Sequence, residues 1–308
     1  MVLPERDGIP PSRVYLDEGP WERVIDFLYD RFPRIAPEIL RERLAAGEIF
    51  DEYGRPVLPA APYRPGRWLW YYREVPNEVP VPFELPVLYR DQRLVVADKP
   101  HFMASTPGGR YLRHTALVRL RRELDLPSLS PMHRLDRDTA GVLLFCADPK
   151  LRGRYQALFQ ARAVRKEYEA VAALPPDLMF PLQYCSRLEE RPGEFIMREV
   201  DGAPNSETRI ELLSTLDAGK LAHFRLLPVT GRKHQLRVHM SALGMPIMND
   251  AYYPTLLEEP AADDFRRPLQ LLARAVEFRD PVDGRMHRYE SSRMLDTVLQ
   301  ARSIMPGN

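Results

Sequence analysis

Residues 131–145 read PMHRLDRDTAGVLLF, a cluster of charged side chains that runs directly into an apolar segment. The apolar part continues through Cys146 and Ala147. Because it lacks polar alternation and is rich in branched and aromatic residues, it predicts a fully buried strand over residues 142–147. One His, two Arg and two Asp therefore lie at the mouth of that strand, where Asp136 is our candidate for a nucleophile.

The length and composition limit what this cluster belongs to. A chain of 308 residues with 44% hydrophobic residues can bury a sizeable core, and we expect one large domain and one small one. No apolar run approaches the roughly 18 residues that span a bilayer, and the N-terminal residues lack a signal-peptide layout. Two cysteines, Cys146 and Cys185, make neither a disulfide framework nor a metal cluster. We expect a soluble, cytoplasmic, monomeric protein with no membrane contact.

The charge balance leaves the partner open. The formal net charge of +1 neither favours nor excludes a nucleic acid, because only charge gathered on one face attracts phosphates. Five of the 44 basic residues are Lys and the rest are Arg, whose planar guanidinium suits phosphates and stacks on bases. Codon bias of the genome is the simpler explanation of this preference, since the Arg residues are spread over the whole chain.

Pro-rich stretches divide the chain. Each Pro removes a backbone donor and turns the preceding residue away from helix, which predicts an extended linker. Before it, helical spacing from Trp21 to Phe32 and from Pro37 to Gly47 predicts two short helices, the second with Ile39 facing inward. We expect a flexible tail at 1–12, a small α/β module at 13–75, the linker at 76–86, a large domain at 87–300 and a tail at 301–308.

Strands and helices are mixed in the large domain. Apolar patterns predict strands at 94–97, 142–147, 166–173, 207–213 and 221–228, and helices at 115–124 and 149–162. These elements do not alternate strictly, as they would in a parallel α/β fold. The fold class that we predict is α+β, with a mixed, largely antiparallel sheet.

A second group of candidate residues lies in the sequence KEYEAV at 166–171. Alternation along a strand places Lys166, Tyr168 and Ala170 on one face, so a cation and a phenol project together. A single strand Tyr is usually a packed, half-buried aromatic residue. Only its combination with the other motifs makes Tyr168 a site candidate.

A third group lies at 229–244, VTGRKHQLRVHMSALG. Thr230 is a good N-cap and Gly244 a good helix terminator, which predicts one amphipathic helix over residues 231–243. A basic helix of this kind is more often a solvated face than a site.

The start of the predicted helix nevertheless has features of an anion-binding site. Arg232 and Lys233 gather at the positive end of the helix dipole. His234 and Arg237 are three residues apart, share a face and can point at a common ligand. His234 and His239 are five apart and do not, which makes a metal site a weak interpretation.

Taken together, the runs HRLDRDTAGVLLF, KEYEAV and LPVTGRKHQLRVHMSALGMPIMND resemble the three signature motifs of the RluA-type pseudouridine synthases, in the same order. The likeness covers residues 88 to about 290. Residues 13–75 more weakly resemble the S-four-like RNA-binding module that precedes the catalytic domain in many of these enzymes, chiefly through LRERLAAGEI at 40–49.

The resemblance implies the pseudouridine synthase fold and an enzyme that isomerises uridine in structured RNA, either large-subunit ribosomal RNA or transfer RNA, without cofactor or metal. The base is detached from the sugar, turned and rejoined through carbon. Asp136 matches the nucleophile, with its attack on sugar or base left open. Arg237 matches the Arg that pairs with it, and Tyr168 the Tyr that lies against the target base.

The target uridine must be flipped out of its stack, and contacts to the RNA must supply the energy. Residues beside the nucleophile and at the start of the predicted helix are the candidates for these contacts. The predicted RNA-binding residues are His133, Arg134, Arg137, Lys166, Arg232, Lys233 and His234.

Three positions depart from the family pattern. Ala140 stands where Ser is usual, Asn249 where Gly is common and Leu272 where a His is common. None of these positions carries a proposed catalytic group, so the departures concern turn packing and the subgroup and leave the chemistry intact.

Two other functions compete with this interpretation. The first is an RNA-binding protein that keeps the fold without turnover, although such a protein has no use for Asp136, Tyr168 and Arg237 together. The second is a metal-dependent hydrolase of phosphoesters, which the scarcity of well-spaced carboxylates disfavours.

Overall fold

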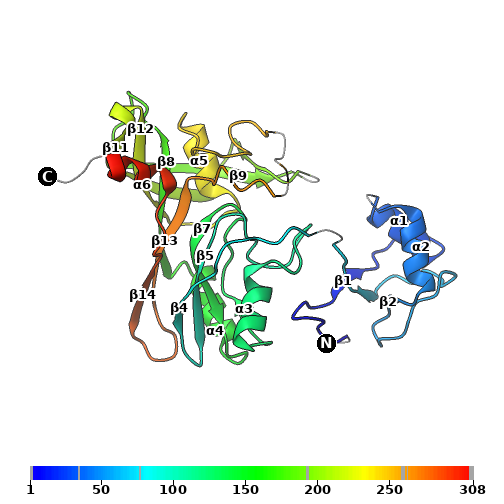
Figure 1. Cartoon of the computed structure of the whole chain (residues 1–308). Helices are drawn as coiled ribbons and strands as arrows, with labels where there is room; N and C mark the ends of the chain where they lie inside the picture. The colour runs from blue at the N-terminus through cyan, green and yellow to red at the C-terminus, as the bar shows by residue number, and fades with distance from the viewer. Residues whose placement is uncertain are drawn as a thin grey trace. The chain divides into compact units, whose positions relative to one another are not determined.

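The chain folds into two compact units in the computed structural model, which describes residues 3–33, 35–75, 78–191, 194–257, 261 and 263–304. The small unit comprises Met1–Glu78 and Gly109–Arg113, and the large unit Val79–Gly108 and His114–Asn308. Figure 1 labels their helices and strands.

The small unit is a three-stranded antiparallel sheet with two helices. Its elements are β1 (Ser12–Tyr15), α1 (Val24–Arg31), α2 (Pro37–Ala45), β2 (Ile49–Phe50) and β3 (Trp68–Tyr71), and β3 lies between β1 and β2. Both predicted helices are present, and Leu28 and Leu44 are buried in a common core. The inward orientation predicted for Ile39 is wrong, since its side chain is exposed.

The chain ends differ from the tails that we expected. Leu3 and Ile9 are buried, and Pro4 accepts a hydrogen bond from the hydroxyl of Tyr72. At the other end, a helix, α6 (Asp296–Ile304), continues into the predicted C-terminal tail. Residues 1–2 and 305–308 lie outside the described part of the chain.

The predicted linker is only partly a connector. Residues 78–86 contain no helix or strand, and Pro76 and Asn77 lie outside the described residues. Val81 and Leu85 are buried in a hydrophobic cluster of the large unit, so this part of the segment belongs to that core.

The large unit is built on one mixed sheet of eleven strands. Its neighbours follow the order β10-β9-β11-β12-β8-β13-β7-β5-β4, with β14 also paired to β13 and β6 to β7. Among the described strands, β7 and β13 form the parallel pair and the other pairings are antiparallel. The predicted α+β class with a largely antiparallel sheet is confirmed.

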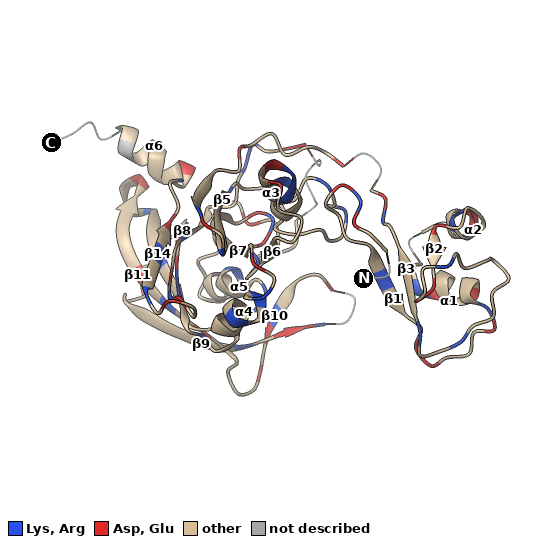
Figure 2. Ribbon diagram, turned by 90° about the horizontal axis from the view of Figure 1, so that it is seen from below, with Lys and Arg blue, Asp and Glu red and all other residues tan. Residues whose placement is uncertain are grey.

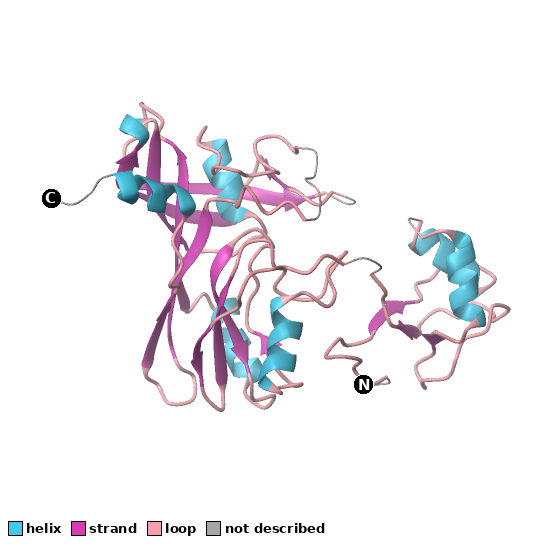
Figure 3. Ribbon diagram, viewed as in Figure 1, coloured by secondary structure: helices cyan, strands magenta, loops and turns pink. Residues whose placement is uncertain are grey.

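Figure 3 shows the helices beside these strands. The bounds are β4 (Val87–Arg90), β5 (Leu94–Lys99), α3 (Ala116–Leu124), β6 (Ser130–Pro131), β7 (Ala140–Cys146), α4 (Arg152–Gln160), β8 (Val164–Ala173), β9 (Leu182–Glu190), β10 (Met197–Val200), β11 (Ser206–Leu216), η1 (Asp217–Gly219), β12 (Leu221–Pro228), α5 (Gln235–Ala242), β13 (Leu271–Arg279) and β14 (Met286–Glu290).

Strand β7 is buried on both faces, as its apolar run predicts. Leu143 packs in a cluster with Leu120 of α3, whereas Val142 packs in another cluster with Tyr155 of α4. All seven of its residues are buried. The loop before β7, which carries Asp136, is therefore attached to a strand that is buried along its whole length.

The parallel pair β7–β13 explains a Gly and two departures from the family pattern. Gly141 has a φ of +112°, and a Cβ there would lie 2.2 Å from the carbonyl oxygen of Ala273. Ala140 lies opposite Leu272 in the same register, and both belong to one apolar cluster. The two positions where the family favours Ser and His are thus neighbours that are both apolar here.

Basic and acidic segments are interspersed in both units, as expected from the net charge of +1 (Figure 2). Among the described residues, no helix is long and apolar enough to cross a membrane.

Candidate active site

A cavity of about 760 Å³ in the large unit brings together every residue that the sequence singled out. The loop between β6 and β7, strand β8 and the segment that leads into α5 contribute its walls. Its lining includes Asp136, Tyr168 and Arg237 together with His133, Arg134, Arg137, Lys166, Arg232, Lys233 and His234.

The Asp136 loop is fixed by residues that the sequence analysis did not assign to the site. The hydroxyl of Ser105 accepts a hydrogen bond from the backbone N–H of Leu135 (3.0 Å) and donates to its carbonyl (2.7 Å). Lys99, fully buried, donates from Nζ to the carbonyl of Arg137 (3.1 Å). Burial lowers the pKa of Lys99 to about 7, although attraction to the nearby Asp138 and Asp136 opposes the shift.

Arg237 lies between two carboxylates. Its Nε and Nη2 donate to Asp250 at 2.8 and 2.6 Å, while Nη1 lies 3.5 Å from Oδ2 of Asp136. Among the described residues, Nη1 has no hydrogen-bond partner, although it is buried. Burial opposes the charge of the guanidinium, but the bonds and charge of Asp250, and then Asp136, raise its pKa above the ordinary value. Arg237 is a fixed cation with one N–H edge turned toward Asp136.

Tyr168 and Lys166 both line the cavity from β8, as the strand alternation predicts. Tyr168 is half-buried, and burial followed by the charge of Asp136 raises the pKa of its phenol, which stays protonated at neutral pH. The Nζ of Lys166 donates to the carbonyl of Thr230 at 3.0 Å. Burial, together with the nearby Arg162, lowers the pKa of Lys166.

The helix predicted over residues 231–243 begins later, at Gln235. His234 has a left-handed φ of +52°, so the chain turns sharply before α5. The predicted N-cap is wrong: the hydroxyl of Thr230 accepts from the N–H of Glu207 (2.9 Å) and donates to Oε1 of Gln235 (2.6 Å). Arg232 consequently lies in a loop that these bonds hold and outside the first turn of the helix.

The two histidines at the cavity are uncharged at neutral pH. Burial lowers the pKa of His234 to about 4, against the attraction of Asp136, and burial lowers that of His133 to about 3. The ring of His133 stacks on Phe159 and its Nε2 accepts the N–H of Leu144 at 3.2 Å. Any contact of these two residues with RNA would thus use the uncharged ring, and their RNA-binding role stays a prediction.

The remaining cations have different surroundings. Arg134 is exposed at the cavity. Arg137 pairs with Asp138 at 2.8 Å, and Lys233 pairs with Glu190. Arg232 is exposed, and its Nε donates to the carbonyl of Asn205 at 3.3 Å. Among the predicted RNA-binding cations, Arg134 and Arg232 are the exposed ones that can meet a phosphate.

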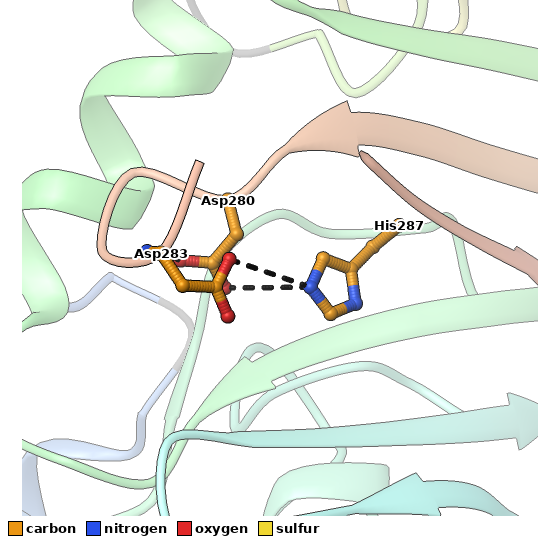
Figure 4. A group of neighbouring side chains, drawn as sticks. All are labelled: Asp280, Asp283 and His287. Atoms are coloured by element: carbon orange, nitrogen blue, oxygen red, sulfur yellow. Dashed lines mark hydrogen bonds and ion pairs between the residues drawn. The ribbon is translucent and has the colours of Figure 1, made fainter. Parts of the chain in front are cut away.

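A cluster with donor types that suit a metal lies elsewhere, at the β13–β14 turn (Figure 4). Nε2 of His287 is 3.9 Å from a carboxylate oxygen of both Asp280 and Asp283. Arg93 already pairs with the two carboxylates, at 3.4 and 2.9 Å, and Tyr155 donates to Asp280 at 2.8 Å. These contacts serve the turn, and none of the cluster's residues lines the cavity.

In sequence and in fold, the chain is similar to known proteins. A family model described as RNA pseudouridylate synthase matches residues 93–242 and does not reach residues 13–75, whose S-four-like character stays a prediction. An uncharacterised RNA pseudouridine synthase, slr1592 of Synechocystis, is 32% identical over 235 residues, which cover 75% of this chain and 79% of that protein.

Dual-specificity RNA pseudouridine synthase RluA of Escherichia coli K12 is 32% identical over 203 residues, 65% of this chain and 89% of the relative. In fold, the solved human RNA pseudouridylate synthase domain containing 1 covers 73% of this chain and 97% of its own, with a TM-score of 0.54 and 24% identity. The chain belongs to the RluA-type RNA pseudouridine synthase family.

Proposed function

We propose that this enzyme converts specific uridines of structured RNA, in large-subunit ribosomal RNA or transfer RNA, to pseudouridine through Asp136 as nucleophile. The observation that carries the proposal is the carboxylate of Asp136, which faces the unpartnered Nη1 of Arg237 at 3.5 Å in a cavity that Tyr168 also lines.

The reaction is an isomerisation, so it consumes no oxidant, reductant or cofactor. The bond from C1′ of the ribose to N1 of the base breaks, the base turns, and C1′ joins C5. The hydrogen of C5 leaves as a proton to solvent, while N1 gains one. A carboxylate that attacks either C1′ or C6 forms a covalent intermediate that divides this exchange into two easier steps.

Arg237 and Tyr168 support that nucleophile in different ways. The positive guanidinium is held by Asp250 and orients Asp136 through charge, without blocking it, since the Asp136 side chain is 30% exposed. A protonated phenol can lie against the target base and hydrogen-bond to its carbonyl or ring atoms. Tyr168 also lies on strand β8, a rigid element that can hold its ring in place against a base.

Binding of the RNA rests on cations and on the small unit. Arg134 and Arg232 offer exposed guanidinium groups at the cavity, where they can hold the phosphates on each side of a flipped uridine. We propose that residues 13–75 supply further RNA contacts. Action as a cytoplasmic monomer stays a prediction.

The RluA relatives are named dual-specificity enzymes, which supports testing both RNA classes. Transfer RNA and large-subunit ribosomal RNA labelled with tritium at C5 of uracil should be prepared from cells that lack this gene and incubated separately with the protein. We expect one RNA class, or both, to release tritium up to a plateau that corresponds to a fixed number of uridines per RNA molecule. Sequencing after carbodiimide treatment then gives the modified uridine. No release from either class overturns the proposal.

A further inference from the structure

An aromatic side chain lies exposed at the edge of the cavity. Phe195, between β9 and β10, has 60% of its surface exposed. Among the described residues, Phe195 and Val229 are the large hydrophobic side chains that are both exposed and in the cavity lining, and Phe195 is the aromatic one. Single exposed hydrophobic residues are common on proteins, so the argument depends on the surroundings of this one.

Phe195 is one side chain away from the nucleophile. Its ring centroid lies 5.3 Å from that of His234 and 5.3 Å from that of Tyr252. Nε2 of His234 lies 4.0 Å from Oδ2 of Asp136. The Nζ of Lys233 lies 4.6 Å from the centroid of the Phe195 ring. The ring of Phe195, with Lys233 beside it, thus lies next to the residues that surround Asp136.

Contacts of the two residues after Phe195 also hold this segment in place. The next two residues, Ile196 and Met197, belong to a hydrophobic cluster with Tyr253 and Val238. The backbone N–H of Met197 also donates to the hydroxyl of Tyr253 at 2.8 Å. These contacts hold the segment against α5, which leaves the exposed ring available for a ligand.

We infer that Phe195 is a stacking surface for the base of a nucleotide that flanks the target uridine. The inference rests on the proposed function, which places the target base at Tyr168 and Asp136. A flipped uridine leaves its neighbours without a stacking partner on one side. Aromatic side chains accept any base by its face, so an exposed ring beside the site can stack on this neighbour.

Kinetics provide the first test, on whichever labelled RNA class the wild-type protein uses. Because stacking on a flanking base acts in the ground state and the transition state alike, Phe195→Ala should raise KM about tenfold or more and leave kcat within about twofold. Phe195→Tyr should have a KM close to the wild-type value, whereas the KM of Phe195→Leu should stay raised. Met179→Ala, which removes an exposed hydrophobic side chain outside this cavity, is the matched control.

Fluorescence provides a direct test of stacking. The three native tryptophans, Trp21, Trp68 and Trp70, all lie in the small unit. Phe195→Trp, introduced together with Asp136→Asn, adds an indole at the cavity of a protein that does not turn over its RNA. Unmodified transfer RNA and large-subunit ribosomal RNA transcripts should quench this added signal, and should not quench that of Met179→Trp in the same background.

The outcomes separate the two proposals. No tritium release by the wild-type protein overturns the proposed function and, with it, the role of Phe195. Release with an unchanged KM for Phe195→Ala overturns the stacking role alone. A raised KM that Leu restores as well as Tyr also overturns it, because apolar packing is then sufficient, and so does equal quenching at Met179→Trp.

Discussion

Arg237 is shared by two aspartates in very different surroundings. The side chain of Asp250 is fully buried and accepts two hydrogen bonds from Arg237. That of Asp136 is 30% exposed and lies 3.5 Å from Nη1 of Arg237 without a hydrogen bond to it. One carboxylate therefore fixes the cation, and the other remains open to the cavity. Asp136 thus has a positively charged neighbour, Arg237, that leaves the lone pairs of its carboxylate free to react.

Asp250→Asn should test whether Asp250 serves to orient Arg237 and not to bind the RNA. The amide cannot accept both hydrogen bonds, so the buried guanidinium turns from its present position toward Asp136. We expect kcat to fall by about 10- to 100-fold with KM within about threefold. Loss of a partner for a buried charge should also lower the free energy of unfolding by about 2 kcal/mol.

Steady-state tritium release and urea unfolding check these two effects. Asp264→Asn, which removes a surface partner of Arg266, is a control that should change neither quantity. A kcat of Asp250→Asn within twofold of the wild-type value would contradict the orienting role.

At the scale of elements, the approach of β7 to β13 depends on a residue without a side chain. An added Cβ at Gly141 meets the carbonyl of Ala273 at 2.2 Å, and the positive φ is strained for any other residue. Gly141→Ala should therefore lower the free energy of unfolding by about 3 kcal/mol or more.

Chemical unfolding monitored by circular dichroism checks this expectation. Gly153→Ala in α4 is the control, because no atom lies within 4 Å of its added Cβ. There the free energy of unfolding should stay equal or rise, as a helical Gly to Ala change usually brings. An equal change in the free energy of unfolding for Gly141→Ala and Gly153→Ala would contradict the close approach of β7 to β13.

Ala140 and Leu272 allow a test of a coupled polar pair. Ala140→Ser or Leu272→His alone buries a polar group among apolar neighbours and should cost about 1–3 kcal/mol. The double variant provides each group with a partner. Its free energy of unfolding should therefore fall by about 1 kcal/mol less than the sum of the losses in the two single variants. Strict additivity in unfolding experiments would mean that the two positions do not pair.

The elements with a strong apolar pattern were predictable from the sequence, and those without one were not. The helix predicted at 115–124 from its apolar pattern is present at 116–124, and the strand predicted at 142–147 is present at 140–146. Strand β9, with the sequence LQYCSRLEE, is polar on much of its surface and has no such pattern. The start of α5 was missed because Thr230 and Gln235 bond to each other and to residues 207 and 208 of β11, and these bonds replace the expected N-cap.

At the scale of the whole molecule, the centre of the large sheet is held by an ion cluster across three strands. Glu169 of β8 accepts from Arg274 of β13 at 2.8 and 2.9 Å and contacts His223 of β12 at 3.1 Å. Burial alone would raise the pKa of Glu169, but its bonds and charges with His223 and Arg274 bring it down to about 2.

Acid unfolding should report this cluster. A folded-state pKa of about 2 against an ordinary 4.5 means that the unfolded chain takes up the proton first as pH falls. The stabilising contribution of Glu169 is thus complete above pH 4.5 and is lost progressively as pH falls toward about 2. Glu169→Gln should lower the free energy of unfolding by roughly 2 kcal/mol at pH 7 and flatten its decline in that range.

Urea unfolding at several pH values between 2 and 7 measures both effects. Glu189→Gln, which affects an exposed pair with Arg187, is the matched control and should follow the wild-type curve. A Glu169→Gln curve that runs parallel to the wild-type curve throughout would contradict the assignment.

The candidate site shows the same limit of prediction as the fold. Motifs contiguous in sequence led to ten residues, all of which are among those that line the cavity, because each motif carries its charges next to an apolar run. The residues that position them, such as Lys99, Ser105 and Asp250, act through hydrogen bonds to distant segments. Such partnerships are set by tertiary structure: Asp250 ends the third motif, but its pairing with Arg237 is visible in the structure alone.

The central claim is that Asp136 carries the isomerisation while other residues bind the RNA. The most direct test compares wild-type protein and Asp136→Asn for tritium release from RNA labelled at C5 of uracil, with RNA affinity measured in parallel. We predict that the variant releases no tritium and binds the RNA within about threefold of wild type. Release by Asp136→Asn at a comparable rate would contradict the account.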